Sequence, residues 1–415
     1  MKKIVIVGAG FGGLKLAQNL KNEKIEVLLI DKNNHHTFQP LLYQVATGGL
    51  EADSIAYPIR RIFRKQKNLS FRMAEALKVI HEKNLIETSI GEIKYDYLII
   101  AIGSTNNFYN FSDVKDDLLP LKSVNNALDM RSYILQNLEN AHQVKEEKEV
   151  KKIMSIAIVG GGPTGIELAG ALAEMKKYVI PKDFPDLDLS KMNIYLFEAA
   201  ENLLSSMSSL ASKAAEGYLE KLGVNIYKSS KVKSYINDQL ELEDGTTFLT
   251  STVIWTAGVK GNMLDGLPSE SMQGNRILVN EYNLVKGLQN VFAIGDIASH
   301  KDKENQNGLP MLAPVANQHG EHLAKNLIRI ENGLKPKPFK YNDKGSMATI
   351  GRKKAVVDFP NKSIKGSIAW FIWLSVHIAS LVGFRNKFVT FLDWFINYIN
   401  YDRPLGLIIR KYKRK

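Results

Sequence analysis

Two glycine motifs constrain the fold of this chain more than any other feature of its sequence. The motif Gly8-x-Gly10-x-x-Gly13 follows an apolar run at 4–7, and Gly160-x-Gly162-x-x-Gly165 follows another at 156–159. Helix-forming residues come next in both places. A strand, such a turn and a helix let the backbone approach a pyrophosphate, which rests against the helix N-terminus. Two copies in 415 residues predict two bound dinucleotides and electron transfer between them.

An acidic residue ends the second strand of each predicted βαβ unit. Asp31 follows the apolar run 27–30, and Glu198 follows the run 194–197. A carboxylate at this position accepts hydrogen bonds from ribose hydroxyls. The interval before Glu198 is longer than usual, and we ascribe the difference to an insertion at 178–191. Further strand-to-glycine transitions at 97–103, 253–258 and 291–296 favour an α/β fold with two Rossmann-like domains.

Composition excludes several chemistries. The chain contains no cysteine, which rules out disulfides, thiolate metal sites, iron–sulfur clusters and cysteine redox pairs, and no metal site is predicted. The N-terminal Met1-Lys2-Lys3 superficially resembles a signal peptide. Because the glycines of the first motif interrupt the apolar run, we expect the first strand of a cytosolic domain instead.

The net charge of +12 is concentrated near the C-terminus. Residues 351–415 contain 13 Lys and Arg against three Asp, so the rest of the chain is nearly neutral. A basic tail suits nucleic acid or an anionic membrane. Trp370, Trp373 and Trp394 lie in the same tail, and this combination of basic, aromatic and apolar residues favours a membrane surface.

The tail also predicts two helices. Residues 366–384 contain no Lys, Arg, Asp or Glu, but serines and His377 dilute this run, which weakens it as a membrane span. In the second helix, at 387–400, one apolar stripe is formed by Phe388, Phe391, Leu392, Phe395, Ile396 and Ile399. We expect an interfacial helical hairpin with aromatic anchors, flanked by Lys411, Lys413, Arg414 and Lys415. A dimer interface is the alternative, and both can hold together.

These motifs carry a family resemblance. Their order, with Gly295-Asp296 as a third element, resembles the flavoproteins with two dinucleotide-binding domains, in which the first motif holds FAD and the second NAD(P)H. The absence of cysteine argues against the disulfide-reductase, peroxidase and sulfide-oxidising branches. The segments 35–48, 163–170, 255–259 and 370–385 resemble the type II NADH:quinone dehydrogenases more closely.

The resemblance implies electron transfer from NADH through one non-covalent FAD to a membrane quinone (menaquinone or ubiquinone), without proton pumping. It also implies a peripheral, monotopic homodimer on the cytoplasmic face of a bacterial inner membrane, bound to anionic lipid and not to nucleic acid. We expect the FAD-binding domain at 1–113 and 285–345, the NADH-binding domain at 114–284, and a C-terminal membrane-anchoring region with amphipathic helices at 346–415.

Carried over residue by residue, the resemblance assigns candidate sites. The residues expected at FAD are Gly8, Gly10, Gly12, Gly13, Asp31, Lys32, Ala76, Leu77, Ala101, Gly103, Gly295, Asp296 and Gln318. Those expected at NADH are Gly160, Gly162, Pro163, Thr164, Gly165, Glu167, Glu198, Ala257 and Gly258. Gln318, Tyr43 and Gln44 are expected at the quinone, and Glu167 and Gln318 are the candidate catalytic residues.

Some of these assignments have plainer alternatives. Glu167 also fits a helix-dipole complement in a first turn, and a lone buried histidine such as His319 is more often structural than a proton donor. Pro314 stands where the family often has glutamine, so a quinone contact of that glutamine is not transferred. The carboxylate of Glu198 repels a 2′-phosphate and therefore predicts NADH over NADPH.

Two other functions fit parts of the sequence. A soluble NADH oxidase or a ferredoxin or rubredoxin reductase has the same fold but no need of the tryptophan-rich tail. A non-enzymatic NADH-binding flavoprotein of the apoptosis-inducing type would carry basic residues over its catalytic domains, which are nearly neutral here.

Overall fold

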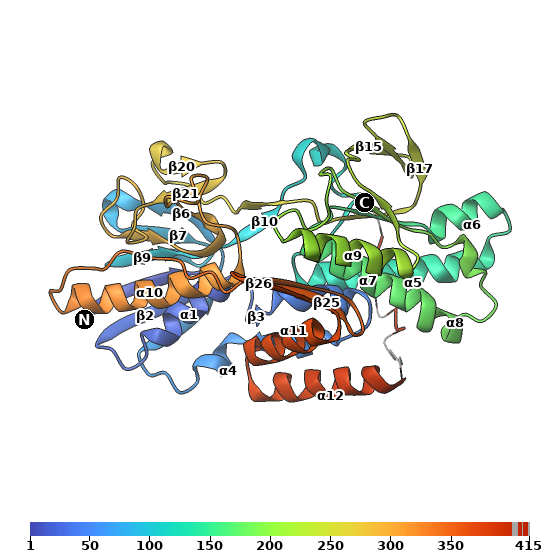
Figure 1. Cartoon of the computed structure of the whole chain (residues 1–415). Helices are drawn as coiled ribbons and strands as arrows, with labels where there is room; N and C mark the ends of the chain where they lie inside the picture. Colours follow the sequence, from blue (N-terminus) through green and yellow to red (C-terminus); the bar gives the residue numbers. More distant parts are fainter. Residues whose placement is uncertain (401–405, 409, 414–415) are drawn as a thin grey trace. The chain divides into compact units, whose positions relative to one another are not determined.

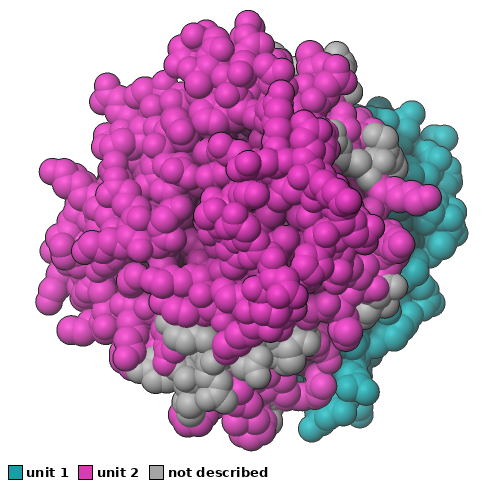
Figure 2. All heavy atoms as spheres, turned by 90° about the vertical axis from the view of Figure 1, so that its right-hand side faces the viewer, with its two compact units in different colours: residues 1–37, 57–105, 259–343 teal, residues 38–56, 106–258, 344–415 magenta. Residues whose placement is uncertain are grey.

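A computed structural model describes residues 1–400, 406–408 and 410–413 of the chain (Figure 1). The chain divides into two compact units, coloured separately in Figure 2. Unit 1 comprises residues 1–37, 57–105 and 259–343, and unit 2 comprises residues 38–56, 106–258 and 344–415. The α/β fold predicted from the two glycine motifs is confirmed, because each unit contains a five-stranded parallel sheet with one motif at its centre.

The sheet of unit 1 has the strand order β22-β9-β1-β2-β5. Residues 4–7 of its central strand are almost fully buried, as expected for a parallel strand covered on both faces. The sheet and its helices comprise β1 (Lys2–Val7), α1 (Phe11–Asn19), β2 (Ile25–Asp31), α4 (Ile59–Phe63), β5 (Leu69–Met73), β9 (Tyr97–Ile100), β22 (Val291–Ala293) and α10 (Ala313–Glu331). Two three-stranded sheets complete the unit, with β6 (Ala76–Ile80), β7 (Leu85–Thr88), β8 (Gly91–Lys94), β20 (Met272–Gln273), β21 (Arg276–Val279) and β23 (Ala298–His300).

The sheet of unit 2 repeats this arrangement with the order β11-β18-β12-β13-β14. Its elements are β11 (Leu119–Pro120), α5 (Val124–Gln143), α6 (Glu147–Met154), β12 (Ile156–Val159), α7 (Pro163–Tyr178), α8 (Ile180–Asp183), β13 (Ile194–Phe197), α9 (Ser209–Lys221), β14 (Asn225–Tyr227) and β18 (Thr252–Trp255). An antiparallel sheet of β15 (Val232–Ile236), β16 (Gln239–Leu242) and β17 (Thr247–Leu249) adjoins it in sequence. The predicted insertion at 178–191 contains α8 and a short 3₁₀ turn.

The position of the glycine turns follows from these strand orders. In each sheet the strand before the glycine motif is the middle one, and the chain adds strands first on one side and then on the other. Such a switch in direction opens a crevice at the carboxyl ends of the strands. Both glycine turns therefore lie where a nucleotide can approach the sheet edge.

The C-terminal part of unit 2 is a small sheet followed by two helices (Figure 1). Its elements are β24 (Ser346–Gly351), β25 (Lys354–Phe359), β26 (Lys362–Lys365), α11 (Ser367–Ser380) and α12 (Phe384–Asn400). The remaining short elements are β3 (His35–Thr37), α2 (Leu42–Ala46), α3 (Ala52–Ile55), β4 (Ala56–Pro58), β10 (Ser104–Asn106) and β19 (Val259–Gly261). Among the described residues, none of the helices has the length and hydropathy that crossing a bilayer requires.

The two predicted tail helices are present, and the apolar stripe of α12 faces outward. Phe388 is 53% exposed and Phe395 is 54% exposed. The opposite face is buried in unit 2, where the Asn386 amide donates to the backbone oxygens of Asp53 and Ala56. The expectation of tryptophans as exposed anchors is wrong for two of them, since Trp373 and Trp394 are buried. The side chain of Ile399 and the predicted basic residues Arg414 and Lys415 lie outside the described residues.

The compact units differ from the expected domain boundaries in several segments. Residues 106–113 and 344–345 belong to unit 2, and so does the whole C-terminal region 346–415, which was expected to be separate. Residues 259–284 belong to unit 1 rather than with the second βαβ unit, because β21 pairs in parallel with β23. Residues 38–56 belong to unit 2, where α2 packs against α5 and α7. The assignment of cofactors to these domains stays a prediction.

Candidate functional site

The glycine turn of unit 1 is shaped to receive a diphosphate. Gly8 has a φ of +105°, and a Cβ on Gly13 would lie 1.9 Å from the carbonyl oxygen of Gly8, so both positions require glycine. Gly10 precedes α1, and a Cβ there would meet no described atom within 4 Å. No described side chain caps this helix start, which leaves its N–H groups available to phosphate oxygens.

The glycine turn of unit 2 has the same construction. Gly160 has a φ of +113°, and a Cβ on Gly165 would lie 1.9 Å from the carbonyl oxygen of Gly160. A Cβ on Gly162 would meet no described atom within 4 Å. Pro163 occupies the first turn of α7, where its missing N–H costs nothing. The backbone thus forms two equivalent cradles, one in each unit.

The two acidic residues hold equivalent positions. The Asp31 carboxylate accepts hydrogen bonds from the N–H groups of Ala9 and Asn33, both at 2.7 Å. The Glu198 carboxylate accepts from the N–H groups of Gly161 and Ala200, at 2.5 and 2.7 Å. Each carboxylate is therefore fixed beside its glycine turn, with oxygen lone pairs left for ribose hydroxyls.

The other predicted FAD residues gather at the same edge of unit 1. Ala101 follows β9 and lies against Gly8, while Gly295 and Asp296 follow β22. Ser104 donates its hydroxyl to Asp296. Lys32, Ala76, Leu77 and Gly103 lie in the segments that leave the ends of β2, β5 and β9 at this edge.

His319 has a structural position in this region. It is fully buried on α10, and its Nδ1 accepts the N–H of Gly295 at 3.2 Å. Burial lowers its pKa to about 3, so the imidazole is neutral at physiological pH. The geometry supports the structural alternative for this residue.

Gln318 is engaged with the backbone of its own unit. Its amide nitrogen donates to the oxygen of Asn342 at 2.9 Å, and its amide oxygen accepts the N–H of the same residue at 3.0 Å. Pro314 occupies the first turn of α10, as its sequence position predicts. Contact of Gln318 with flavin or quinone stays a prediction.

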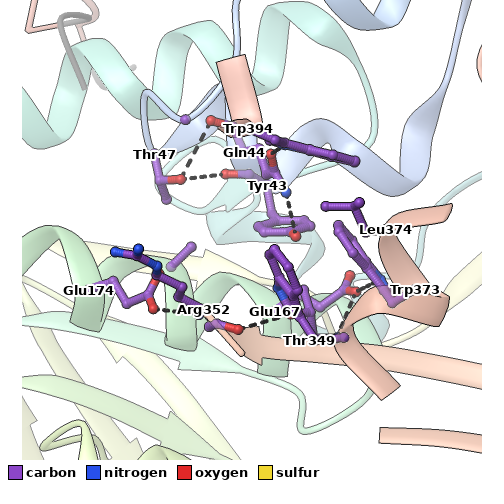
Figure 3. Close-up of a pocket in the computed structure, with 14 residues that line it drawn as sticks. Tyr43, Gln44, Thr47, Glu167, Glu174, Thr349, Arg352, Trp373, Leu374 and Trp394 are labelled. Carbon is purple, nitrogen blue, oxygen red and sulfur yellow. Dashed lines mark hydrogen bonds between the residues drawn. The ribbon is translucent and has the colours of Figure 1, made fainter. Parts of the chain in front are cut away.

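Unit 2 contains an aromatic pocket that joins three of the predicted residues (Figure 3). The pocket has a volume of about 100 Å³. It is lined by Tyr43, Gln44, Thr47, Gly49, Glu167, Ala171, Glu174, Thr349, Gly351, Arg352, Trp370, Trp373, Leu374 and Trp394. The pocket combines apolar and aromatic walls with a few polar groups, as ligand-binding sites commonly do.

Glu167 is a buried acid on one wall of this pocket. Its Oε1 accepts hydrogen bonds from the Thr349 N–H and the Trp373 indole N–H, both at 3.3 Å. Burial raises its pKa to about 8, although these two hydrogen bonds act in the opposite direction. Because α7 begins at Pro163, Glu167 lies in the second turn, and the helix-dipole alternative does not explain its burial.

Tyr43 and Gln44 lie together on another wall (Figure 3). The Gln44 amide nitrogen donates to the Tyr43 phenol oxygen at 2.8 Å. The indole N–H of Trp394 donates to the Gln44 amide oxygen at 2.6 Å. The pocket thus combines residues near position 44, the second glycine helix and the C-terminal helices.

Sequence reasoning missed several residues of this pocket. Glu174 lies two turns after Glu167 on the same face of α7, a spacing that was available in the sequence. Its carboxylate accepts the backbone N–H of Arg352 at 2.6 Å. Thr349 and Arg352 lie in or next to β24, and no local motif marks them.

Comparisons with known proteins identify the family of the chain. A family model for pyridine nucleotide-disulphide oxidoreductases matches residues 2–320, and a model for the NDH2 C-terminal domain matches residues 344–400. The chain is 32% identical to the type II NADH:quinone oxidoreductase Ndh of Mycobacterium tuberculosis, over 97% of this chain and 89% of the relative. For the NdhA protein of the same organism the identity is 30%, over 97% and 88%.

A solved structure shows the same fold. NDH2 of Plasmodium falciparum in complex with NADH superposes with a TM-score of 0.90 at 23% identity, covering 97% of this chain and 99% of that one. This likeness shows that the fold of the chain is a known one. The chain belongs to the type II NADH:quinone oxidoreductase family.

Proposed function

We propose that this protein oxidises NADH with one non-covalently bound FAD and passes both electrons to a membrane quinone. One NADH, one quinone and one proton give NAD⁺ and quinol, without proton pumping. The observation that carries the proposal is the duplicated cradle in one chain with the aromatic pocket. Two cradles suit two dinucleotides, and the pocket suits a third, ring-shaped substrate.

FAD fits the first cradle. The open space beside Gly10 accommodates a pyrophosphate, and Asp31 offers oxygen lone pairs to the adenosine ribose. In this proposal, as the family resemblance implies, Asp296 accepts a ribityl hydroxyl and Ala101 and Gly103 line the FAD. Ala76 and Leu77 are the residues proposed beside the adenine. When bound, the flavin accepts a hydride from NADH and delivers two electrons to the quinone.

NADH fits the second cradle, through Gly160, Gly162, Gly165 and the start of α7. The fixed carboxylate of Glu198 accepts the ribose hydroxyls and repels a 2′-phosphate, so NADPH is a poor substrate. Ala257 and Gly258 follow β18 beside Gly160 and complete the edge.

The quinone ring binds in the aromatic pocket, beside Tyr43, Gln44 and Glu167. A contact of Gln318 with the quinone is what the family resemblance implies. Quinol carries two hydrogens more than the quinone, one that left NADH as hydride and one proton taken up in the overall balance. Glu167 is protonated at neutral pH because burial raises its pKa to about 8. A neutral carboxylic acid in an apolar pocket is suited to donate a proton to a reduced quinone oxygen.

The C-terminal helix pair, α11 and α12, places the protein on a lipid surface. Its outward apolar side chains are Ile368, Phe371, Val376, Phe388, Phe391, Leu392, Phe395 and Ile396. Such a face buries area in the interfacial layer, while basic residues such as Lys411 and Lys413 attract anionic lipid. We place the protein on the cytoplasmic face of a bacterial inner membrane, as a homodimer that reduces menaquinone or ubiquinone and binds no nucleic acid.

The two rival functions are not favoured. The NDH2 C-terminal domain matches residues 344–400, the region that a soluble NADH oxidase or ferredoxin reductase has no need of. A non-enzymatic flavoprotein does not account for the buried acid in the aromatic pocket.

Anaerobic mixing tests the proposal. NADH should bleach the flavin absorbance of the purified protein, and a subsequent addition of menadione should restore it. Reduced flavin that menadione does not reoxidise would remove quinone reduction from the proposal. Equal rates of bleaching by NADH and NADPH would remove the assigned role of Glu198.

A further inference from the structure

The C-terminal helices do more in this structure than present an apolar face. Each sends one buried indole N–H to a polar group on the wall of the aromatic pocket (Figure 3). We infer that Trp373 and Trp394 are positioning residues for quinone reduction, each acting through the side chain that it hydrogen-bonds. The inference rests on the proposed binding of quinone in this pocket.

Trp394 orients the amide of Gln44. Its indole can only donate, so the group that it meets must be the amide oxygen, at 2.6 Å. The amide nitrogen is then turned toward Tyr43 and donates to the phenol oxygen at 2.8 Å. One indole on α12 therefore sets which groups Gln44 and Tyr43 present to a bound ring.

Trp373 orients the carboxyl group of Glu167. Its indole and the Thr349 N–H both donate to Oε1, which leaves Oε2 as the oxygen that carries the acidic hydrogen. Trp373 is itself only 2% exposed and stacks on His377, with ring centroids 4.1 Å apart. Burial, the stacked imidazole and the hydrogen bond to Glu167 together hold the indole N–H in this direction.

Burial alone does not explain these two hydrogen bonds. A buried indole N–H generally finds an acceptor, and a backbone carbonyl would satisfy it. Trp255 in the same unit does so, donating to the Asn107 oxygen at 2.8 Å. The two tail tryptophans instead donate to Gln44 and Glu167, two of the polar side chains that line the pocket.

The first test removes the Trp394 donor and keeps an aromatic ring. Trp394→Phe is expected to raise the dissociation constant and the KM for menadione roughly 3- to 10-fold, the loss of one hydrogen bond. Calorimetric titration of the oxidised protein measures the dissociation constant without turnover. The rate of flavin bleaching by NADH should stay at the wild-type value.

A double-mutant cycle asks whether Trp394 acts through Gln44. Gln44→Met removes the acceptor of the Trp394 indole N–H and, with it, the hydrogen bond from Gln44 to Tyr43. If the inference holds, the double variant binds menadione no more weakly than the weaker single variant. Effects that add would show that Trp394 does not act through Gln44. Gln44→Met also carries the test if Trp394→Phe does not fold.

The second test uses a pH profile. An indole N–H stabilises the charged carboxylate, so Trp373→Phe is expected to raise the pKa of Glu167 further. The rate of flavin reoxidation by menadione should fall at high pH as Glu167 loses its proton, and in Trp373→Phe this alkaline limb should move to higher pH. Glu167→Gln has no such proton and should lack the limb. The other ionisable side chains nearby are Tyr43, Glu174, Arg352 and His377, and burial lowers the pKa of His377 to about 4.

The outcomes separate the inference from the proposed function. Trp255→Phe is the matched control, since it removes a buried indole bond outside the pocket and should leave menadione binding and the alkaline limb in place. Two results together would overturn the inference but not the proposed function. Trp394→Phe would bind menadione with the wild-type dissociation constant, and Trp373→Phe would reoxidise its flavin with the wild-type alkaline limb. A wild-type protein whose flavin menadione does not reoxidise would overturn the proposed function first.

Discussion

The two glycine cradles have the same backbone but carry different side chains two residues after the third glycine. In unit 1 this position is Lys15, which is partly exposed and whose Nζ lies 3.9 Å from Oε2 of Glu321. In unit 2 it is Glu167, which is buried beside Thr349 and Trp373. The side chain at this position is thus partly exposed in unit 1, whereas in unit 2 it lines the aromatic pocket.

The difference comes from what covers each helix. In unit 1, α1 packs against the helix α10, whereas in unit 2, α7 packs against the strand β24 and the short helix α2. The strand and short helix bring Thr349, Tyr43 and Gln44 beside the second cradle helix. The same glycine motif therefore has a helix packed on it in unit 1, and a pocket wall beside it in unit 2.

The largest expected effect comes from filling the two cradles. In Gly13→Ala and Gly165→Ala the new methyl group would lie 1.9 Å from a backbone oxygen, so the turn must open. Gly13→Ala should be purified without flavin, whereas Gly165→Ala should keep flavin but lose its bleaching by NADH. Absorbance spectra distinguish the two. Gly162→Ala is the control, because its methyl meets no described atom within 4 Å, and it should fold normally.

The pH dependence of stability should reveal the buried acid. The pKa of Glu167 rises to about 8 on folding from 4.5, so its contribution is complete below pH 4.5 and is lost as the pH rises toward 8. Between pH 5 and 8 the wild type should lose on the order of 4 kcal/mol of unfolding free energy relative to Glu167→Gln. Urea unfolding of both proteins at pH 5 and pH 8 measures this difference. The same change in unfolding free energy in wild type and Glu167→Gln would contradict the raised pKa.

Activity should separate the two equivalent positions. Glu167→Gln keeps the shape of the side chain but removes the acid, and we expect reoxidation by menadione to slow about 10- to 100-fold, while NADH still bleaches the flavin. Lys15→Met is the matched control in the first cradle helix and should behave as wild type. If both substitutions slowed reoxidation by menadione equally, the role assigned to Glu167 in the pocket would be wrong.

The smallest effect concerns coenzyme choice. Glu198→Gln removes the negative charge beside the second cradle, so the preference for NADH over NADPH should fall about 10-fold in kcat/KM. The equivalent change in the first cradle, Asp31→Asn, should weaken FAD retention without altering that preference. A changed coenzyme preference in Asp31→Asn would reverse the assignment of the cradles.

Much of this architecture could be predicted because its signals are local. Both cradles follow from an apolar run, three glycines and an acidic residue at the next strand end, since each feature reports on backbone geometry within a short segment. The tail helices follow from a run without charge and from one apolar stripe. The family resemblance assigned site roles to Tyr43, Gln44 and Glu167, and the structure brings these three residues into one pocket.

The direction of the tail side chains could not be predicted in the same way. Tryptophans in an amphipathic tail are typical of a membrane interface, yet Trp373 and Trp394 point into unit 2 while phenylalanines face outward. Periodicity finds the faces of a helix but does not say which face meets protein, because that depends on partners distant in sequence. Gln44 and Trp394 are 350 positions apart and share a hydrogen bond.

The sequence by itself determined two nucleotide cradles, the exclusion of cysteine chemistry and a basic, aromatic tail, because these depend on residue identity and short-range spacing. Only the tertiary structure decided that Glu167 is buried and that two indoles hold the polar groups of its pocket. The physical reason is that a pKa and a hydrogen-bond partner depend on the surroundings of a group. In this protein those surroundings come from α2, β24 and the C-terminal helices.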